Sequence, residues 1–268
     1  MSGLEYCFST LGCPELSLHQ VADLSERHGI EAVELRALSG VLDLPTALVA
    51  EFGDPAGLAG FLSGRKMRVI ALDTSVRLFD DADLSALEPF IAWAEEAGAE
   101  YLRVFDGGGR LSEADLKQAV NMLDAWQVIR QSRGLNVDLM IETHDALADF
   151  EQLVAFVEQV PTARILWDTH HTWARGADTE GLWRGIARSV VHLHVKDSAP
   201  DGDGGRRYVL PGQGHFPMAG LISILQSHER GLPLSLEWER HWHPELPSLE
   251  DALKAAHTWW RQGAFWCA

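Results

Sequence analysis

The chain of 268 residues is close in length to a single α/β barrel, which takes about 250 residues. Its formal net charge of −17 argues against binding to a nucleic-acid backbone, because such binding needs clustered Lys and Arg. No apolar run reaches about 18 residues and the first residues lack the parts of an export signal, so we expect no membrane span. The three cysteines, Cys7, Cys13 and Cys267, are odd in number and far apart. This usage is typical of free thiols in a reducing compartment and predicts a cytoplasmic protein.

Eight short apolar runs alternate with helical patterns along the chain. We expect strands at 5–9, 32–36, 68–72, 101–105, 137–142, 164–168, 190–196 and 234–238. Strands separated by helices need crossover connections, so they pair in parallel and the helices cover the sheet. Eight such units without a linker predict a single (β/α)8 TIM-barrel domain over residues 1–268. The alternative is a doubly wound open sheet, although the chain lacks a strand–GxGxxG–helix start.

Capping residues and glycines mark where helices and loops begin and end. Ser17 and Gln20 have the spacing of a capping box, and Gly29 is well placed to end the same helix in a left-handed conformation. The segment 198–214 is rich in glycine and shows no strand or helix pattern. Irregular segments of this length are usually lids or disordered, and a solvated surface turn is the alternative.

Four consecutive predicted strands end in side chains of the types that bind metal ions. These residues are Glu142 on the fifth strand, Asp168 on the sixth, His194 on the seventh and Glu237 on the eighth. Catalytic groups of a barrel lie at the C-terminal ends of its strands, so we expect the four to meet at one point. Three carboxylates and one imidazole favour one divalent ion, with Mn²⁺, Mg²⁺ or Co²⁺ before Zn²⁺. Its open coordination positions would take two oxygens of a substrate.

Each of these residues, taken alone, has a simpler interpretation. An acid such as Glu142 at a strand end is often a turn residue or a helix cap. Alternation along the seventh strand points His192, His194 and Lys196 inward. His192 lies below the rim and is expected to be a hydrogen-bonded core residue, whereas Lys196 could equally be a solvated lysine at the strand end. Chance is nevertheless a poor explanation for four such strand ends in a row, so the metal site is the stronger interpretation.

Several segments resemble one known superfamily over nearly the whole chain. The segments are CFSTLGCPELSLHQVADLSERHGIEAVELR, MIETHD, WDTHHTW, HLHVKDS, LPGQGHF and LSLEWE, and they are similar to the xylose isomerase-like TIM barrels. That superfamily contains sugar isomerases and epimerases and the endonuclease IV repair enzymes. The resemblance implies that the metal ligands are Glu142, Asp168, His194 and Glu237. It also implies that the two glutamates move protons at the substrate carbons and that His171 contacts the substrate.

The chain departs from the endonuclease branch of this superfamily. That branch uses additional histidines on strands two and three and an Asp-x-His pair after strand seven. Here the second strand ends in Glu34-Leu35-Arg36, the third ends in Asp73-Thr74-Ser75, and the segment 198–214 has no Asp-x-His. Together with the net charge of −17, these departures disfavour a role as an endonuclease.

A second branch competes with the isomerases. The strings ETH, HVK and SLEW are also similar to 3-dehydroshikimate dehydratases on the same scaffold. This resemblance implies that His144 and Lys196 join the metal ion in removing water from a hydroxy-ketone. His144 shares the inward face of the fifth strand with Glu142, so the expected geometry permits this role.

The function expected from the sequence is a divalent-metal-dependent isomerase or epimerase of a sugar or sugar phosphate. Glu142 and Glu237 would transfer protons through an enediolate or enolate. Arg206 and Arg207 would close on an anionic or polyhydroxylated small molecule, and Trp173 would line the mouth of the barrel. A dehydratase, a barrel that only binds a ligand, and assembly into a homo-oligomer stay open at this stage.

Overall fold

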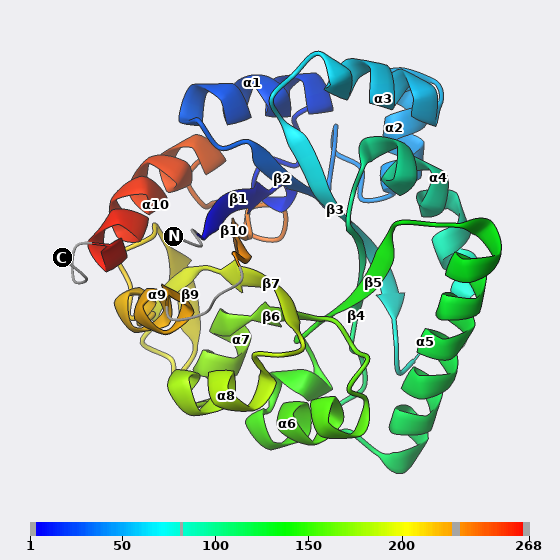
Figure 1. Ribbon diagram of the computed structural model, residues 1–268. Coiled ribbons are helices and arrows are strands. Elements are labelled where there is room, and N and C mark those ends of the chain that lie inside the picture. The colour runs from blue at the N-terminus through cyan, green and yellow to red at the C-terminus, as the bar shows by residue number, and fades with distance from the viewer. Residues whose placement is uncertain (1–3, 81–82, 227–230, 265–268) are drawn as a thin grey trace.

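Eight of the described strands form one closed parallel barrel. The computed structural model describes residues 4–80, 83–226 and 231–264. The strands follow the order β1-β10-β7-β6-β5-β4-β3-β2 around the barrel (Figure 1). Their bounds are β1 (Glu5–Ser9), β2 (Ala32–Leu35), β3 (Arg68–Arg77), β4 (Tyr101–Phe105), β5 (Asp138–Glu142), β6 (Ile165–Asp168), β7 (Val190–Val195) and β10 (Pro233–Leu236). The predicted (β/α)8 barrel is therefore confirmed, and the alternative of an open doubly wound sheet is wrong.

Helices form a ring outside the strands (Figure 1). The α-helices are α1 (Leu18–His28), α2 (Leu44–Phe52), α3 (Pro55–Ser63), α4 (Glu88–Ala97), α5 (Glu113–Arg133), α6 (Phe150–Gln159), α7 (Thr169–Ala174), α8 (Thr179–Ile186), α9 (Met218–Gln226) and α10 (Leu249–Ala264). Three short 3-10 helices are η1 (Thr10–Gly12), η2 (Leu84–Leu87) and η3 (Ala146–Ala148). Helix α10 contacts α1, so the last helix closes the ring beside the first. Within the described ranges, the helices are all too short or too polar to cross a membrane.

The inside of the barrel has an apolar floor beneath a polar upper half. One buried cluster contains Ala71, Met140, Leu166 and Val191, and another contains Cys7, Ala32 and Ile70. Side chains alternate along a strand, so the residue two positions after an inward apolar residue also points inward. Ala71, Met140, Leu166 and Ala32 are followed at this spacing by Asp73, Glu142, Asp168 and Glu34. The strand period thus places acids directly above the apolar floor.

Local sequence signals for the first helix are confirmed. Ser17 caps α1 by accepting from the backbone N–H of Gln20, and the side chain of Gln20 reaches back to the backbone of Ser17. Gly29 ends the helix with φ 63, a left-handed conformation that glycine adopts without strain. Cys7 and Cys13 are buried free thiols, whereas Cys267 lies outside the described residues.

Two expectations about individual strands are wrong. Strand β3 does not end at residue 72 but continues through Asp73, Thr74 and Ser75 to Arg77. Val191, which alternation would point towards the helices, packs in the inner cluster with Met140. The reason for the second error is a register shift, because Ile165 pairs with Val190 and the next residue, Leu166, pairs with His192. One extra residue in β7 changes which face its neighbours occupy.

The glycine-rich segment after β7 is a hairpin rather than an irregular loop. Strands β8 (Asp197–Pro200) and β9 (Arg206–Val209) pair in antiparallel fashion. The buried carboxylate of Asp197 accepts hydrogen bonds from the backbone N–H groups of Gly212 at 2.9 Å, Gly214 at 2.8 Å and Phe216 at 3.0 Å. The return chain from the hairpin is therefore attached to the end of β7.

We expect Gly214→Ala to destabilise the protein by about 1–3 kcal/mol, because overpacking has costs of this size. A Cβ at this position would lie 2.2 Å from Oδ1 of Asp197 and 2.4 Å from the carbonyl oxygen of Ser198. The matched control is Gly220→Ala in α9, where a Cβ meets nothing within 4 Å. Urea denaturation should give a lower midpoint for the first variant and an unchanged or higher midpoint for the second. Equal midpoints would contradict this account of the hairpin.

Candidate metal centre

Side chains from four neighbouring strands converge at the C-terminal end of the barrel. One ligand atom from each of Glu142, Asp168, His194 and Glu237 lies within 4.8 Å of the other three, and all four residues are buried. Glu142 and Asp168 are the last residues of β5 and β6, His194 lies in β7, and Glu237 directly follows β10. The four residues expected to form a common site are thus brought together.

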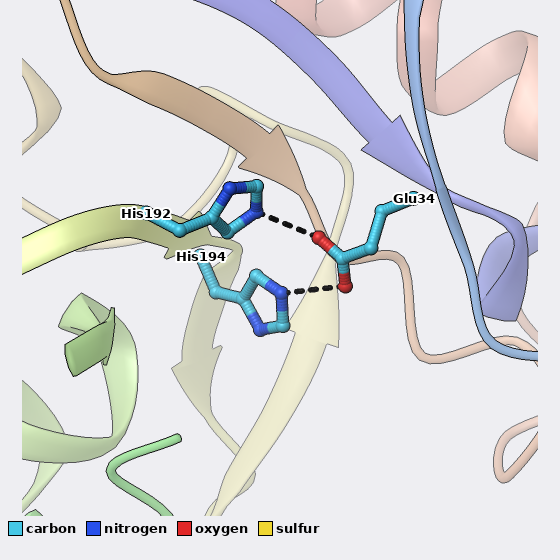
Figure 2. Close-up of side chains that lie close together, drawn as sticks. All are labelled: Glu34, His192 and His194. Carbon is cyan, nitrogen blue, oxygen red and sulfur yellow. Dashed lines mark hydrogen bonds and ion pairs between the residues drawn. The ribbon is translucent and has the colours of Figure 1, made fainter. Parts of the chain in front are cut away.

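The imidazole of His194 is oriented by a buried glutamate of β2, a strand that lies three places from β7 around the barrel (Figure 2). Nε2 of His194 donates to Oε1 of Glu34 at 2.8 Å, and Nε2 of His192 donates to Oε2 of the same carboxylate at 2.7 Å. Burial opposes ionisation of Glu34, but His194 and His192 hold its pKa well below the usual range, so it accepts both bonds. Nδ1 of His194 therefore faces Glu237 at 3.2 Å and Glu142 at 3.5 Å. A carboxylate on one imidazole nitrogen, with the other nitrogen turned to the site, is the usual arrangement at a metal centre.

Three buried atoms of the cluster have ion-pair partners but make no further hydrogen bond among the described residues. Nδ1 of His194 lies 3.2 Å from Glu237, Oε2 of Glu142 lies 3.1 Å from Nε of Arg103, and Oδ2 of Asp168 lies 2.7 Å from Nζ of Lys196. The other oxygen of Asp168 accepts from the backbone N–H of His171 at 2.8 Å, where it caps α7. A carboxylate oxygen accepts more than one contact and a deprotonated imidazole nitrogen has a lone pair, so these atoms can also coordinate an ion. The donor set of three carboxylates and one imidazole fits a divalent ion.

Buried acids outnumber buried bases around this cluster. The carboxyl groups belong to Glu34, Asp73, Glu142, Asp168, Glu237 and Glu239, and the cationic side chains to Arg36, Arg103 and Lys196. Burying an excess of like charge is costly unless a counter-charge is present. Burial raises the pKa of Asp73 well above its ordinary value and also raises the pKa of Glu239, so protons offset part of this excess. A dication among the acids would supply further counter-charge.

Lys196 is directed into the barrel rather than into solvent. Its ammonium group lies 2.7 Å from both Asp168 and Glu239 and also pairs with Glu237. Burial opposes the charge, but the carboxylates of these residues raise the pKa of Lys196 well above its ordinary value. Lys196 therefore carries a positive charge beside two of the four clustered residues.

The residues predicted to contact a substrate, apart from Trp173, lie around two adjoining cavities. A small cavity of about 40 Å³ is lined by Glu142 and Glu237. A larger cavity of about 860 Å³ is lined by Arg206 and Arg207. His144 and His171 line both.

Trp173 has a different place from the one expected. It does not line either cavity but supports Arg206, whose guanidinium lies 4.0 Å from the centroid of its indole ring. Nε of Arg206 also donates to Oγ of Ser198 at 2.9 Å across the hairpin. Trp173 and the hairpin therefore hold Arg206 at the edge of the larger cavity.

Two carboxylates near the cluster are not singled out by the motifs in the sequence. Glu34 is a charged residue in the otherwise apolar strand β2, at the inward spacing from Ala32. Glu239 is two residues after Glu237, and both pair with the ammonium group of Lys196. Alternation could have found Glu34, because it places this residue among the inward acids of the barrel. Glu239 lies beyond the end of β10, where strand alternation no longer applies.

A sequence model of the xylose isomerase-like TIM barrels matches residues 20–263. The chain belongs to this family. No curated protein matches the sequence. The family membership confirms the resemblance found in the sequence segments.

Solved structures with a similar fold cover almost the whole chain. The IolI protein with a binding zinc atom has a TM-score of 0.77 and 20% identity, over 97% of this chain and 98% of that one. The probable 3-DHS dehydratase AsbF of petrobactin synthesis from Bacillus anthracis has a TM-score of 0.75 and 18% identity, over 95% and 99%. A xylose isomerase domain protein from Salmonella typhimurium has a TM-score of 0.69 and 13% identity, over 97% of both chains. At these identities the similarity concerns the fold.

We expect Glu34→Gln to weaken binding of Mn²⁺ by roughly 10–100-fold, the usual effect of losing such a partner of a metal-binding histidine. The carboxylate of Glu34 orients His194 and makes its Nδ1 more basic. The amide of glutamine lacks the negative charge that has these effects. Isothermal titration calorimetry of the metal-free protein measures the affinity. Glu31→Gln, at an exposed position before β2, is the control and should bind Mn²⁺ as the wild type does. Equal affinities for both variants would contradict the positioning role of Glu34.

Binding of the ion should release about one proton at neutral pH. Burial opposes protonation of His194, but Glu237 and Glu34 raise its pKa well above the ordinary value. The metal-free protein therefore carries this proton at neutral pH, and a ligand at Nδ1 must displace it. The affinity should rise with pH up to the raised pKa. Calorimetry in two buffers of different ionisation enthalpy counts the protons, and a pH-independent affinity without proton release would contradict this assignment.

Proposed function

We propose that the chain, as one barrel domain over residues 1–268, is a divalent-metal-dependent isomerase or epimerase of a sugar or sugar phosphate. The observation that carries this proposal is the convergence of four ligand atoms beside a cavity of about 860 Å³. We propose Mn²⁺, Mg²⁺ or Co²⁺ as the ion and include Zn²⁺, because the similar IolI structure holds zinc. The ligands would be Glu142, Asp168, His194 and Glu237.

The two glutamates of the cluster are suited to proton transfer. A dication held there would polarise a carbonyl and a neighbouring hydroxyl, which would acidify the proton on the carbon that bears the hydroxyl. Burial opposes ionisation of Glu142, but Arg103, 3.1 Å away, lowers its pKa. Burial acts in the same way on Glu237, and there His194 and Lys196 hold the pKa well below the usual range. Both side chains are therefore ionised near neutral pH and can accept a proton.

The positions of these two bases favour epimerisation or isomerisation. Glu142 ends β5 and Glu237 follows β10, and β6 and β7 lie between these strands in the barrel. The two carboxylates therefore approach a ligand above the cluster from different sides. One of them can remove a proton and return that proton to the neighbouring carbon, which isomerises the substrate. If the other carboxylate has first taken up a proton from solvent, it can deliver this proton to the opposite face of the carbon, which epimerises the substrate.

His171 is suited to bind a substrate hydroxyl. Burial lowers the pKa of its imidazole, so the ring is neutral near pH 7. Its Nδ1 lies 3.3 Å from the carbonyl oxygen of Thr143 and 3.3 Å from Oδ2 of Asp168. These contacts occupy Nδ1, which leaves Nε2 for a small polyhydroxylated molecule in the two cavities. Arg206 and Arg207 line the larger cavity and would bind the distal end of such a molecule.

Dehydration of a hydroxy-ketone is the second candidate, and Lys196 favours it. Its buried ammonium group lies beside Asp168 and Glu237 and can stabilise a departing hydroxyl. His144 lines the small cavity and could supply a proton to the same group. An ultraviolet-absorbing aromatic product from 3-dehydroshikimate, lost in Lys196→Met, would select this reaction over isomerisation.

We place the reaction in the cytoplasm, with no nucleic-acid partner. The buried free thiols of Cys7 and Cys13 suit a reducing compartment. The net charge of −17 opposes contact with a phosphate backbone.

With Mn²⁺ in D₂O, the protein should exchange deuterium into one of a panel of ketoses and ketose phosphates, at the carbon next to the carbonyl. Glu142→Gln and Glu237→Gln should each lower this rate by about 10²–10⁴-fold, the usual contribution of a general base. NMR follows the exchange, and circular dichroism checks the fold of each variant.

The control variant is Glu158→Gln, an exposed position on α6 that lines neither cavity, and it should exchange at the wild-type rate. Removal of the ion with EDTA should stop exchange in all variants. Exchange that persists in both glutamate variants would contradict the assigned roles.

A further inference from the structure

Arg36 has a buried charge with an open hydrogen-bond donor. It follows β2, is only 4% exposed and lines the small cavity together with Glu142 and Glu237. Its Nη2 donates to Oγ of Ser75 at 3.0 Å, whereas Nη1 is buried and has no partner among the described residues. The guanidinium therefore has unused donor capacity beside the proposed metal ligands.

A second arginine, Arg103, lines the same cavity and, unlike Arg36, pairs with carboxylates. Arg103 forms ion pairs with Glu142 at 3.1 Å and with Asp73 at 3.5 Å, so its charge has counter-ions. Arg36 forms no such pair with a carboxylate in the described parts of the chain. Burial and the nearby Arg103 lower the pKa of Arg36 to about 10, so it is still charged at neutral pH. A buried guanidinium without a counter-ion is unfavourable, and an anionic ligand would remove that cost.

The position of Arg36 is fixed before any ligand binds. Its backbone N–H donates to Oγ1 of Thr10 at 2.8 Å, and the next residue, Ala37, donates to the same oxygen at 3.2 Å. The bond to Ser75 holds one side of the guanidinium fork, so the open side has a defined direction. A preorganised donor loses little conformational entropy when it binds its partner.

We propose that Arg36 binds an oxyanion of the substrate, either a carboxylate or a phosphate. This inference rests on the proposed function for one point only, namely that the reacting carbons lie over Glu142 and Glu237. The small volume of the cavity, about 40 Å³, favours a planar carboxylate over the bulkier phosphate. The rest of the substrate extends past His144 and His171 into the larger cavity.

Titration calorimetry with glycolate, inorganic phosphate and uncharged glycerol tests this assignment. Each compound is added to the wild type and to Arg36→Met, which keeps the length of the side chain but removes its charge. We expect the variant to bind glycolate about tenfold more weakly or worse, because charge-assisted hydrogen bonds are worth at least this factor. Binding of glycerol should be unchanged. A drop confined to phosphate would instead identify a phosphorylated substrate.

Two further arginine variants localise the effect. Arg188→Gln changes an exposed arginine just before β7 and should bind every probe as the wild type does. Arg206→Gln changes an arginine of the larger cavity and tests the alternative that the small anions bind there. Anion affinity that depends on Arg206 and not on Arg36 would overturn the proposal, as would equal affinities for wild type and Arg36→Met. If Arg36→Met weakened the binding of glycerol as much as the binding of glycolate, the proposal that Arg36 recognises a negative charge would be wrong.

A purely structural role for Arg36 predicts different results. In that case Arg36→Met would melt at a lower temperature and would keep the wild-type affinity for the anions. We expect the ligand-free variant to melt at the same temperature as the wild type or higher, because an unpaired buried charge is removed. Each titration is repeated on chelator-treated protein. If the protein takes up no metal and turns over no sugar, Arg36-dependent anion binding in these samples still distinguishes this inference from the proposed function.

Discussion

The excess of buried carboxylates at the mouth of the barrel is the constraint on which the site depends. Carboxylates can be buried only if cations, hydrogen-bond donors or protons compensate them. In the metal-free chain, Lys196, Arg103 and the proton on His194 provide this compensation. This leaves capacity for coordination, because Nδ1 of His194, Oε2 of Glu142 and Oδ2 of Asp168 make no hydrogen bond beyond their ion pairs with Glu237, Arg103 and Lys196 among the described residues. A divalent ion at this point would be coordinated by these atoms and would add counter-charge to the acids.

The remainder of the barrel holds this unfavourable arrangement in place. The apolar floor of Met140, Leu166 and their neighbours lies beneath the acids, and the outer core packs the helices against the strands. Glu34 of β2 fixes His194 of β7, and Asp168 is held through its cap on α7. Functional sites commonly combine a strained or charged arrangement with a stable scaffold, at a cost in stability. The charge cluster on its apolar floor is an example of that division.

The sequence predicted the barrel and the cluster because both depend on periodicity along the chain. Alternating strands and helices indicate parallel pairing, and strand ends indicate which side chains meet. Glu142, Asp168 and Glu237 could be placed in this way before any distance was known. Glu34 could not be given its role, because it depends on a contact with His194, 160 positions away, between strands β2 and β7 that are not neighbours. The role of Arg36 could not be assigned from the sequence either, since only the packed structure shows that its Nη1 is buried and has no hydrogen-bond partner among the described residues.

The hairpin was missed for a different physical reason. Its glycines and aspartates are residues that favour turns, so the segment has a weak strand signal of its own. What orders it is the carboxylate of Asp197, which binds three backbone N–H groups on the far side of the turn. Such tertiary contacts are invisible to local patterns, and here they place Arg206 beside the larger cavity.

Anomalous diffraction at the manganese edge, from crystals soaked in Mn²⁺, tests the central claim most directly. The account predicts one strong anomalous peak in contact with Nδ1 of His194 and with carboxylate oxygens of Glu142, Asp168 and Glu237. A map without a peak at this position, from crystals saturated with manganese, would contradict it.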